Sequence, residues 1–180
     1  MATTIVYHSV YGSTKRYADA LDEKLRAAGI DVTDSPQRFS AEGFTLADVS
    51  QGSTVIVLTP VFGPNVEGSD VAVEAAEAGC RVALVTVGLT DPEKAAEHDF
   101  SARGLGRYVD TIKRFYVPGR VNMEELSTPH SAAIRGLVGV YTLKPNKTQF
   151  EKDFAESKGR NFDRVDVDRM DDVVAWVRGE

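Results

Sequence analysis

The sequence predicts an α/β fold in which a doubly wound, five-stranded parallel sheet carries helices on both faces. Short β-branched runs recur at 5–7, 54–58 and 82–87, and each is nearly continuous in apolar residues, as in strands buried on both faces. Segments with helical spacing separate these runs. Alternation of strands and helices is typical of parallel sheets, whose ligands bind beyond the carboxyl ends of the strands.

The first strand, 5–7, runs through a polar turn into a helix. Apolar residues recur in that helix at Tyr17, Leu21 and Leu25. Gly29 is well placed to stop it. The expected elements that follow are a second strand at 30–33, a short helix near 41–49, a third strand at 54–58 and a helix at 70–78.

The remaining elements continue the alternation. A fourth strand is expected at 82–87, a helical region within 92–112 and a fifth strand at 114–117. An amphipathic helix built on Met170, Val173 and Trp176 closes the chain, and Trp176 is expected in the core rather than in a cofactor site. All 180 residues are expected to form one domain, since 42% hydrophobic residues suit one core.

The turn after the first strand has the composition of an anion site. The first N–H groups of a helix lack internal acceptors, and the helix dipole favours negative charge there. Hydroxyls at Ser9, Ser13 and Thr14 add donors, and Gly12 permits a positive φ. The turn is therefore expected to hold a phosphate without a lysine. The alternative is that Ser13 or Thr14 only caps the helix.

Two common phosphate sites are excluded by what the turn lacks. A P-loop requires G-x-x-x-x-G-K-[ST], and here one glycine and no lysine precede the Ser-Thr pair. A dinucleotide fingerprint requires three glycines in G-x-G-x-x-G, which are absent. A nucleoside triphosphate of the P-loop type and a Rossmann-bound NAD are therefore not expected.

The order Ser9-Val10-Tyr11-Gly12-Ser13-Thr14 resembles the FMN-phosphate loop of flavodoxins. Tyr11 departs from their usual Thr or Ser, as in the branch that includes the menaquinone-dependent protoporphyrinogen IX dehydrogenases. The resemblance continues through 54–58, 81–87 and the run R-F-Y-V-P-G-R-V, and reaches about Leu126. It implies a flavodoxin-like sheet with strand order 2-1-3-4-5 and a family-variable helical segment at about 122–160.

The resemblance implies FMN as cofactor, held by three loops. Phe62 in the second loop is expected either to stack on the flavin ring or to tuck into its own loop or under a helix. Asp91, after the third loop, is expected to cap the next helix. The implied cofactor-binding residues are Ser9, Val10, Tyr11, Gly12, Ser13, Thr14, Pro60, Val61, Phe62, Gly63, Gly88, Leu89 and Thr90.

The implied function is electron or hydride transfer through bound FMN. The third loop lacks the tyrosine that many electron-carrier flavodoxins stack over the flavin, which favours an oxidoreductase acting on a quinone or protoporphyrinogen-type substrate over a pure carrier. Redox partner proteins and quinone acceptors are both open as partners. The alternative is a non-enzymatic module that binds another phosphate ligand. No catalytic residue is identified.

The segment 129–144 carries an apolar stripe of Ile134, Leu137, Val138 and Tyr141. Core packing is the favoured interpretation. The alternatives place the stripe over the flavin site, in a quinone pocket or at a membrane surface.

Composition narrows the remaining functional classes. A net charge of −6 disfavours nucleic-acid binding. No apolar run approaches the roughly 20 residues of a transmembrane helix, and a cytoplasmic location is expected. The single cysteine, Cys80, is expected to be structural, and His8, His98 and His130 show no metal-site spacing, so no metal is expected. A homodimer remains open.

Overall fold

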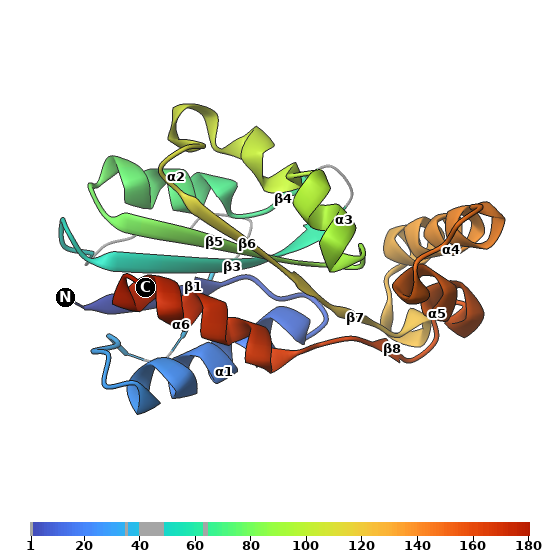
Figure 1. Cartoon of the computed structure of the whole chain (residues 1–180), viewed down its shortest axis with the longest axis horizontal. Helices are drawn as coiled ribbons and strands as arrows, with labels where there is room; N and C mark the ends of the chain where they lie inside the picture. The colour runs from blue at the N-terminus through green and yellow to red at the C-terminus, as the bar shows by residue number, and fades with distance from the viewer. Residues whose placement is uncertain (1, 35, 40–48, 63–64) are drawn as a thin grey trace.

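A five-stranded parallel sheet lies between two layers of helices (Figure 1). The computed structural model describes residues 2–34, 36–39, 49–62 and 65–180. The strands run in the order β2-β1-β3-β5-β6, and β4 pairs only with the end of β3. The predicted order 2-1-3-4-5 is therefore confirmed. The bounds are β1 Thr3–Tyr7, β2 Gln37–Arg38, β3 Thr54–Phe62, β4 Asn65–Val66, β5 Arg81–Gly88 and β6 Lys113–Pro118.

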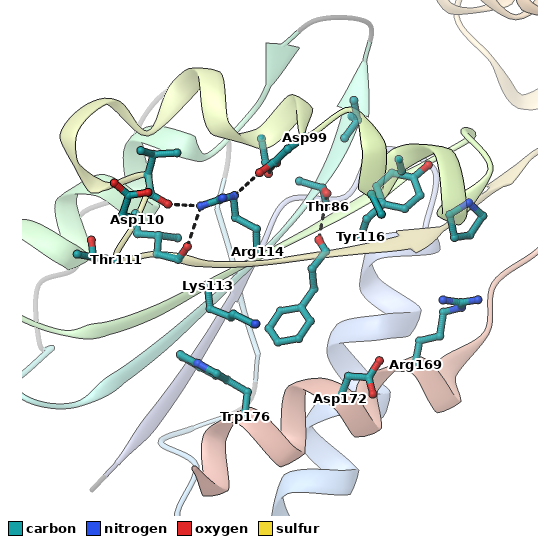
Figure 2. Close-up of a pocket in the computed structure, with 18 residues that line it drawn as sticks. Thr86, Asp99, Asp110, Thr111, Lys113, Arg114, Tyr116, Arg169, Asp172 and Trp176 are labelled. Atoms are coloured by element: carbon teal, nitrogen blue, oxygen red, sulfur yellow. Dashed lines mark hydrogen bonds and ion pairs between the residues drawn. The ribbon is translucent and has the colours of Figure 1, made fainter. Parts of the chain in front are cut away.

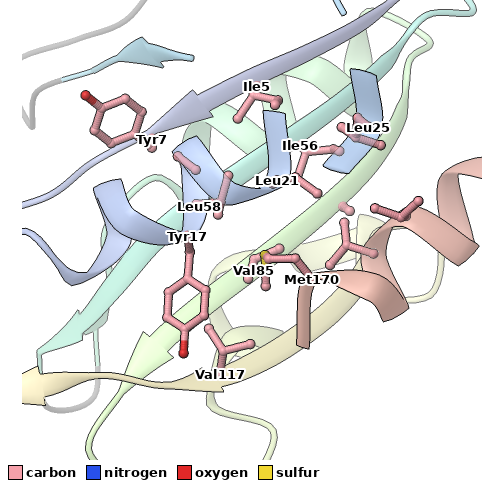
Figure 3. Packing of buried hydrophobic residues seen from close by; sticks show 14 of the residues in the cluster. Ile5, Tyr7, Tyr17, Leu21, Leu25, Ile56, Leu58, Val85, Val117 and Met170 are labelled. Atoms are coloured by element: carbon pink, nitrogen blue, oxygen red, sulfur yellow. The ribbon is translucent and has the colours of Figure 1, made fainter. Parts of the chain in front are cut away.

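Successive strand residues enter opposite layers of core, which explains the continuous apolar runs. Ile5 and Ile56, paired in register, face helices α1 (Ser13–Ala27) and α6 (Met170–Arg178), as Figure 3 shows. Their neighbours in the strands pack against α2 (Ser69–Glu77) and the short helical turns η1 (Phe100–Gly104) and η2 (Gly106–Tyr108).

The predicted helix ends agree with the structure. Gly29 follows α1 with φ of 74°, a left-handed conformation that suits glycine. Asp91 caps α3 (Pro92–Glu97), because its carboxylate accepts the N–H of Glu93 at 3.0 Å, and this confirms the capping interpretation.

Two predicted segments differ from the structure. Strand β2 lies at Gln37–Arg38 rather than at 30–33, where only Val32 bridges to Thr3. Asp34 has φ of 55° and Pro36 has no N–H to donate, so the ladder breaks between these positions. The segment predicted as a loop from 59 is strand as far as Phe62. The helix predicted near 41–49 falls almost wholly outside the described residues.

A small second core lies beyond the carboxyl ends of the strands. It consists of Val121, Tyr141, Phe154 and Phe162. Around it lie β7 (Arg120–Val121), η3 (Met123–Glu125), α4 (Thr128–Leu143), α5 (Gln149–Ser157) and β8 (Phe162–Asp163), at the right of Figure 1; η4 (Val167–Arg169) then leads into α6. Buried Glu151 of α5 pairs with Lys144, at the end of α4, and also lies 3.7 Å from Lys94 of α3. These ion pairs connect α4 and α5 to each other and to α3.

Tyr17 joins three parts of the fold with one hydroxyl. Its ring is fully buried, and the hydroxyl donates to the carbonyl of Pro118 at 2.6 Å and accepts the N–H of Asp166 at 2.9 Å. Burial raises the pKa of Tyr17 to about 12.

We expect Tyr17→Phe to lower the free energy of unfolding by about 1–3 kcal/mol at pH 7, because it leaves a buried carbonyl and N–H unpaired. Between pH 10 and 12 the unfolded chain releases the Tyr17 proton while the folded chain keeps it. The stability advantage of the wild type should therefore shrink as pH rises through this range. Urea denaturation at several pH values measures both effects.

The matched control is Tyr7→Phe. The ring of Tyr7 is also buried, but its hydroxyl makes no hydrogen bond with any residue in the described ranges. Equal destabilisation by the two substitutions would contradict the role given to the Tyr17 hydroxyl.

Candidate functional site

The loop after β1, the end of β3 and the end of β5 with the loop that follows it meet at one cavity of about 580 Å³. This placement follows from parallel strands, whose carboxyl ends share one edge of the sheet. Ser9 and Gly12 shape the first loop without lining the cavity, and Gly63 lies outside the described residues. The sequence-predicted residues that line the cavity are Val10, Tyr11, Ser13, Thr14, Pro60, Val61, Phe62, Gly88, Leu89 and Thr90.

The first loop presents unpaired donors to this cavity. Ser9 Oγ accepts the N–H groups of Gly12 at 3.2 Å and Lys15 at 3.4 Å, and Gly12 occupies the N-cap with φ of 88°. Within the described ranges, the N–H groups of Ser13 and Thr14 have no acceptor. Neither hydroxyl caps α1, so the capping alternative is wrong for both residues.

Thr14 is the clearest polar group aimed at the cavity. The residue is 2% exposed and lines the cavity, and its hydroxyl makes no hydrogen bond with a described residue. The hydroxyl oxygen is not among the buried, unpartnered side-chain atoms of the described residues, so a ligand or water in the cavity can reach it. The N-terminal end of α1 therefore has a side-chain donor as well as backbone donors for an anion.

Three rings form one wall of the cavity. Phe62 and His130 are stacked, with centroids 4.5 Å apart and planes 5° from parallel. Tyr11 meets both rings edge-on. Phe62 therefore packs against helix α4, which was one of the two alternatives for its side chain. It also lines the cavity, and stacking on a flavin ring, the other alternative, stays a prediction.

The Tyr11 hydroxyl ties the first loop to the start of α4. It lies 2.6 Å from His130 Nδ1, accepts the N–H of Ser127 at 3.2 Å and donates to Ser127 Oγ at 3.4 Å. These contacts join two segments that both line the cavity.

Helix α4 serves both the small core and the cavity. Tyr141 is buried in the small core, and its hydroxyl donates to the carbonyl of Leu89 at 3.4 Å. Ile134 and Leu137 pack against that core and also line the cavity. The core-packing interpretation is thus confirmed for the stripe, and part of the stripe also faces the cavity.

Tyr116 fixes the third loop. Its hydroxyl accepts the N–H of Thr90 at 2.8 Å and donates to the Thr90 carbonyl at 3.0 Å. Burial raises the Tyr116 pKa, so the hydroxyl stays protonated and able to donate. A Cβ at Gly88 would lie 2.7 Å from the same hydroxyl, so this close approach requires glycine.

A second cavity, of about 740 Å³, lies along the outer edge of β6 (Figure 2). Two of its arginines are paired within the protein. Arg114 pairs with Asp99 at 2.6 Å and donates to the carbonyls of Val109 and Ile112, and Arg169 pairs with Asp166 at 3.4 Å. Trp176 borders this cavity and packs against the core, and it does not line the 580 Å³ cavity. None of the predicted loop residues except Val61 lies here.

His8 has a structural position. Its Nδ1 donates to the carbonyl of Phe39 at 3.1 Å, and its Nε2 lies 2.9 Å from the carboxylate of Glu67. The part of the chain that the structure describes holds no group of three His, Cys, Asp or Glu side chains able to bind a metal ion. None of its helices is long and apolar enough to cross a bilayer.

Residues 4–149 match the model of the flavodoxin domain. The chain belongs to the flavodoxin domain family. Among solved structures, it is similar to a C101S mutant of flavodoxin from Pseudomonas aeruginosa, with 17% sequence identity and a TM-score of 0.39 over 74% of this chain and 91% of that one. No curated protein matches the sequence. The observed strand order, β2-β1-β3-β5-β6, is the one expected from the resemblance to flavodoxins.

Several cavity residues carry no local sequence signal. His130 and Arg120 come from segments more than 100 residues away from the first loop, and neither belongs to a recognisable motif. Arg120 belongs to the run R-F-Y-V-P-G-R-V, but this run does not indicate that the Arg120 side chain lies at the first loop. Ile134 and Leu137 belong to the stripe for which a place over the flavin site was one alternative. The other lining residues that were not predicted are Val87, Tyr116, Gly119, Val121, Leu126 and Ala133.

We expect Tyr11→Phe to loosen the start of α4 while leaving the ring contacts in place. Loss of a hydrogen bond worth about 1 kcal/mol corresponds to roughly fivefold faster amide exchange at Ser127 and in the first turn of α4. Hydrogen–deuterium exchange of this segment is the measurement. Tyr108→Phe is the control, because among the described residues the Tyr108 hydroxyl bonds only to exposed Arg107. Unchanged exchange in Tyr11→Phe would show that the hydroxyl does not hold α4.

Proposed function

We propose that this flavodoxin-domain protein binds FMN in the 580 Å³ cavity and works as a redox protein. The observation that carries the proposal is the convergence of unpaired donors and apolar walls in one cavity, in a chain of this family. Family members use bound flavin to exchange electrons, so a redox partner is implied.

The phosphate end fits the first loop. The N–H groups of Ser13 and Thr14 and the Thr14 hydroxyl are donors without acceptors among the described residues. No Asp or Glu is among the described residues that line the cavity, and the carboxylate of Glu125 is hydrogen-bonded to the lining residue Arg120. A phosphate at this end would also gain from the dipole of the fifteen-residue helix α1.

The ring end fits the apolar walls. Phe62 is the last residue of β3 and Leu89 directly follows β5, while Leu126, Ile134 and Leu137 come from the α4 side. These side chains would bind a planar ring and exclude water from it. Bound flavin supplies the one- or two-electron chemistry, and the protein supplies orientation and environment.

The cover formed by α4 favours an enzyme over a pure carrier. Apolar side chains of α4 face the cavity, so an apolar acceptor could be enclosed beside the flavin. We therefore propose a quinone or protoporphyrinogen-type molecule as the substrate class, with electron exchange to a protein as the second possibility.

The first test is the visible absorbance spectrum of the purified protein after excess FMN is added and unbound dye is removed. A retained flavin spectrum is expected. Quinone reduction by the reduced protein then separates an enzyme from a carrier that passes electrons only to proteins. A protein that takes up no flavin would overturn the proposed function.

We expect Ser13→Ala combined with Thr14→Val to weaken FMN about 10- to 100-fold and riboflavin far less, because a hydrogen bond to a charged group contributes about 1.5–3 kcal/mol. Fluorescence titration gives both dissociation constants. Thr111→Ala, which removes an exposed hydroxyl that bonds only to the Tyr108 carbonyl, is the control. Equal losses for the two ligands would exclude this loop as the phosphate site.

A further inference from the structure

Arg120 is joined to the first loop through both its backbone and its side chain. Its N–H donates to Ser13 Oγ at 3.4 Å. Its Nε and Nη2 donate to the carbonyl of Tyr11 at 3.3 and 3.2 Å. The residue lines the same cavity as Ser13 and Thr14. Strand β7 therefore brings a guanidinium to the loop that carries the unpaired donors.

This guanidinium retains donors for a ligand. Its Nη2 also donates to Glu125 Oε2 at 2.5 Å, while Nη1 has no acceptor within the described ranges. The side chain of Arg120 is 31% exposed, so its charge is partly shielded from water. An arginine with a free pair of N–H donors is well suited to bind a phosphate.

The other cations near the first loop do not line the cavity. Arg38 donates from Nη2 to the carbonyl of Ser9 at 3.0 Å, and it is not among the lining residues. Lys15 pairs with Asp19 at 2.6 Å, and Arg16 pairs with Asp163 at 2.7 Å. Neither lines the cavity, and Arg120 is the one Lys or Arg among its described lining residues.

We propose that Arg120 recognises the charge of the ligand's phosphate and makes the site select a flavin phosphate over an uncharged flavin. The inference rests on the proposed function and adds a cationic specificity residue to a loop whose own donors are neutral. Glu125, held by Asn122 Nδ2 at 3.2 Å, partly neutralises the guanidinium and so limits the affinity for the phosphate.

The test compares dissociation constants for FMN and riboflavin in the wild type, Arg120→Met and Arg120→Lys. We expect Arg120→Met to weaken FMN about 10- to 150-fold, as expected for one lost hydrogen bond to a charged group, and riboflavin less than about threefold. Arg120→Lys should keep most of the FMN preference, because it keeps the charge. Added salt should weaken FMN binding more in the wild type than in Arg120→Met.

Two further variants test the role of the Arg120 charge. Glu125→Gln removes the competing charge at a half-exposed position and should tighten FMN without changing riboflavin. Arg16→Met removes a cation that lies outside the cavity and should change neither ligand by more than about twofold, since that charge is exposed and already paired.

The outcomes separate the two proposals. Equal loss of FMN and riboflavin in Arg120→Met, or no FMN preference in Arg120→Lys, would show that Arg120 only supports the loop and would overturn this inference. A wild type that binds neither flavin would overturn the proposed function itself, and this inference with it.

Discussion

Burial of both faces of the sheet is the constraint on which the rest of the structure depends. The central strand β3 runs from Val55 to Leu58 without exposed surface, and helices cover it from either side. Polar groups cannot be placed along such a strand without partners. Binding groups are therefore confined to the places where strands end, and parallel pairing gathers those places at one edge.

Tyr11 departs from the family pattern, and its side chain makes contacts that a smaller residue could not make. Flavodoxin loops usually carry Thr or Ser at this position. The longer side chain of Tyr11 instead reaches Ser127 and His130 and holds α4 over the cavity. Its backbone carbonyl binds Arg120. Tyr11 thus contacts helix α4 through its hydroxyl and the cavity residue Arg120 through its carbonyl.

Sequence reasoning succeeded where the signal was local. The run from Ile5 into the turn at Gly12 contains a strand, a positive-φ glycine and a helix start within one short segment, so both the elements and the candidate loop could be predicted. Arg120 and His130 could not, since their place depends on how β7 and α4 cross the strand ends, which no short window encodes. The position of β2 was predicted wrongly for another reason. Its two residues carry a weaker hydrophobic pattern than the apolar segment before them, at 30–33.

The net charge of the chain and the charge of its cavity have opposite signs. The chain carries −6, whereas the described residues lining the cavity include Arg120 and no carboxylate. Exposed acids such as Asp19 and Asp163 are paired at the surface. At physiological ionic strength a charge more than about 8 Å away is largely screened, so an anionic ligand in the cavity responds mainly to Arg120 and the end of α1. An acidic net charge is therefore compatible with an anion bound in this cavity.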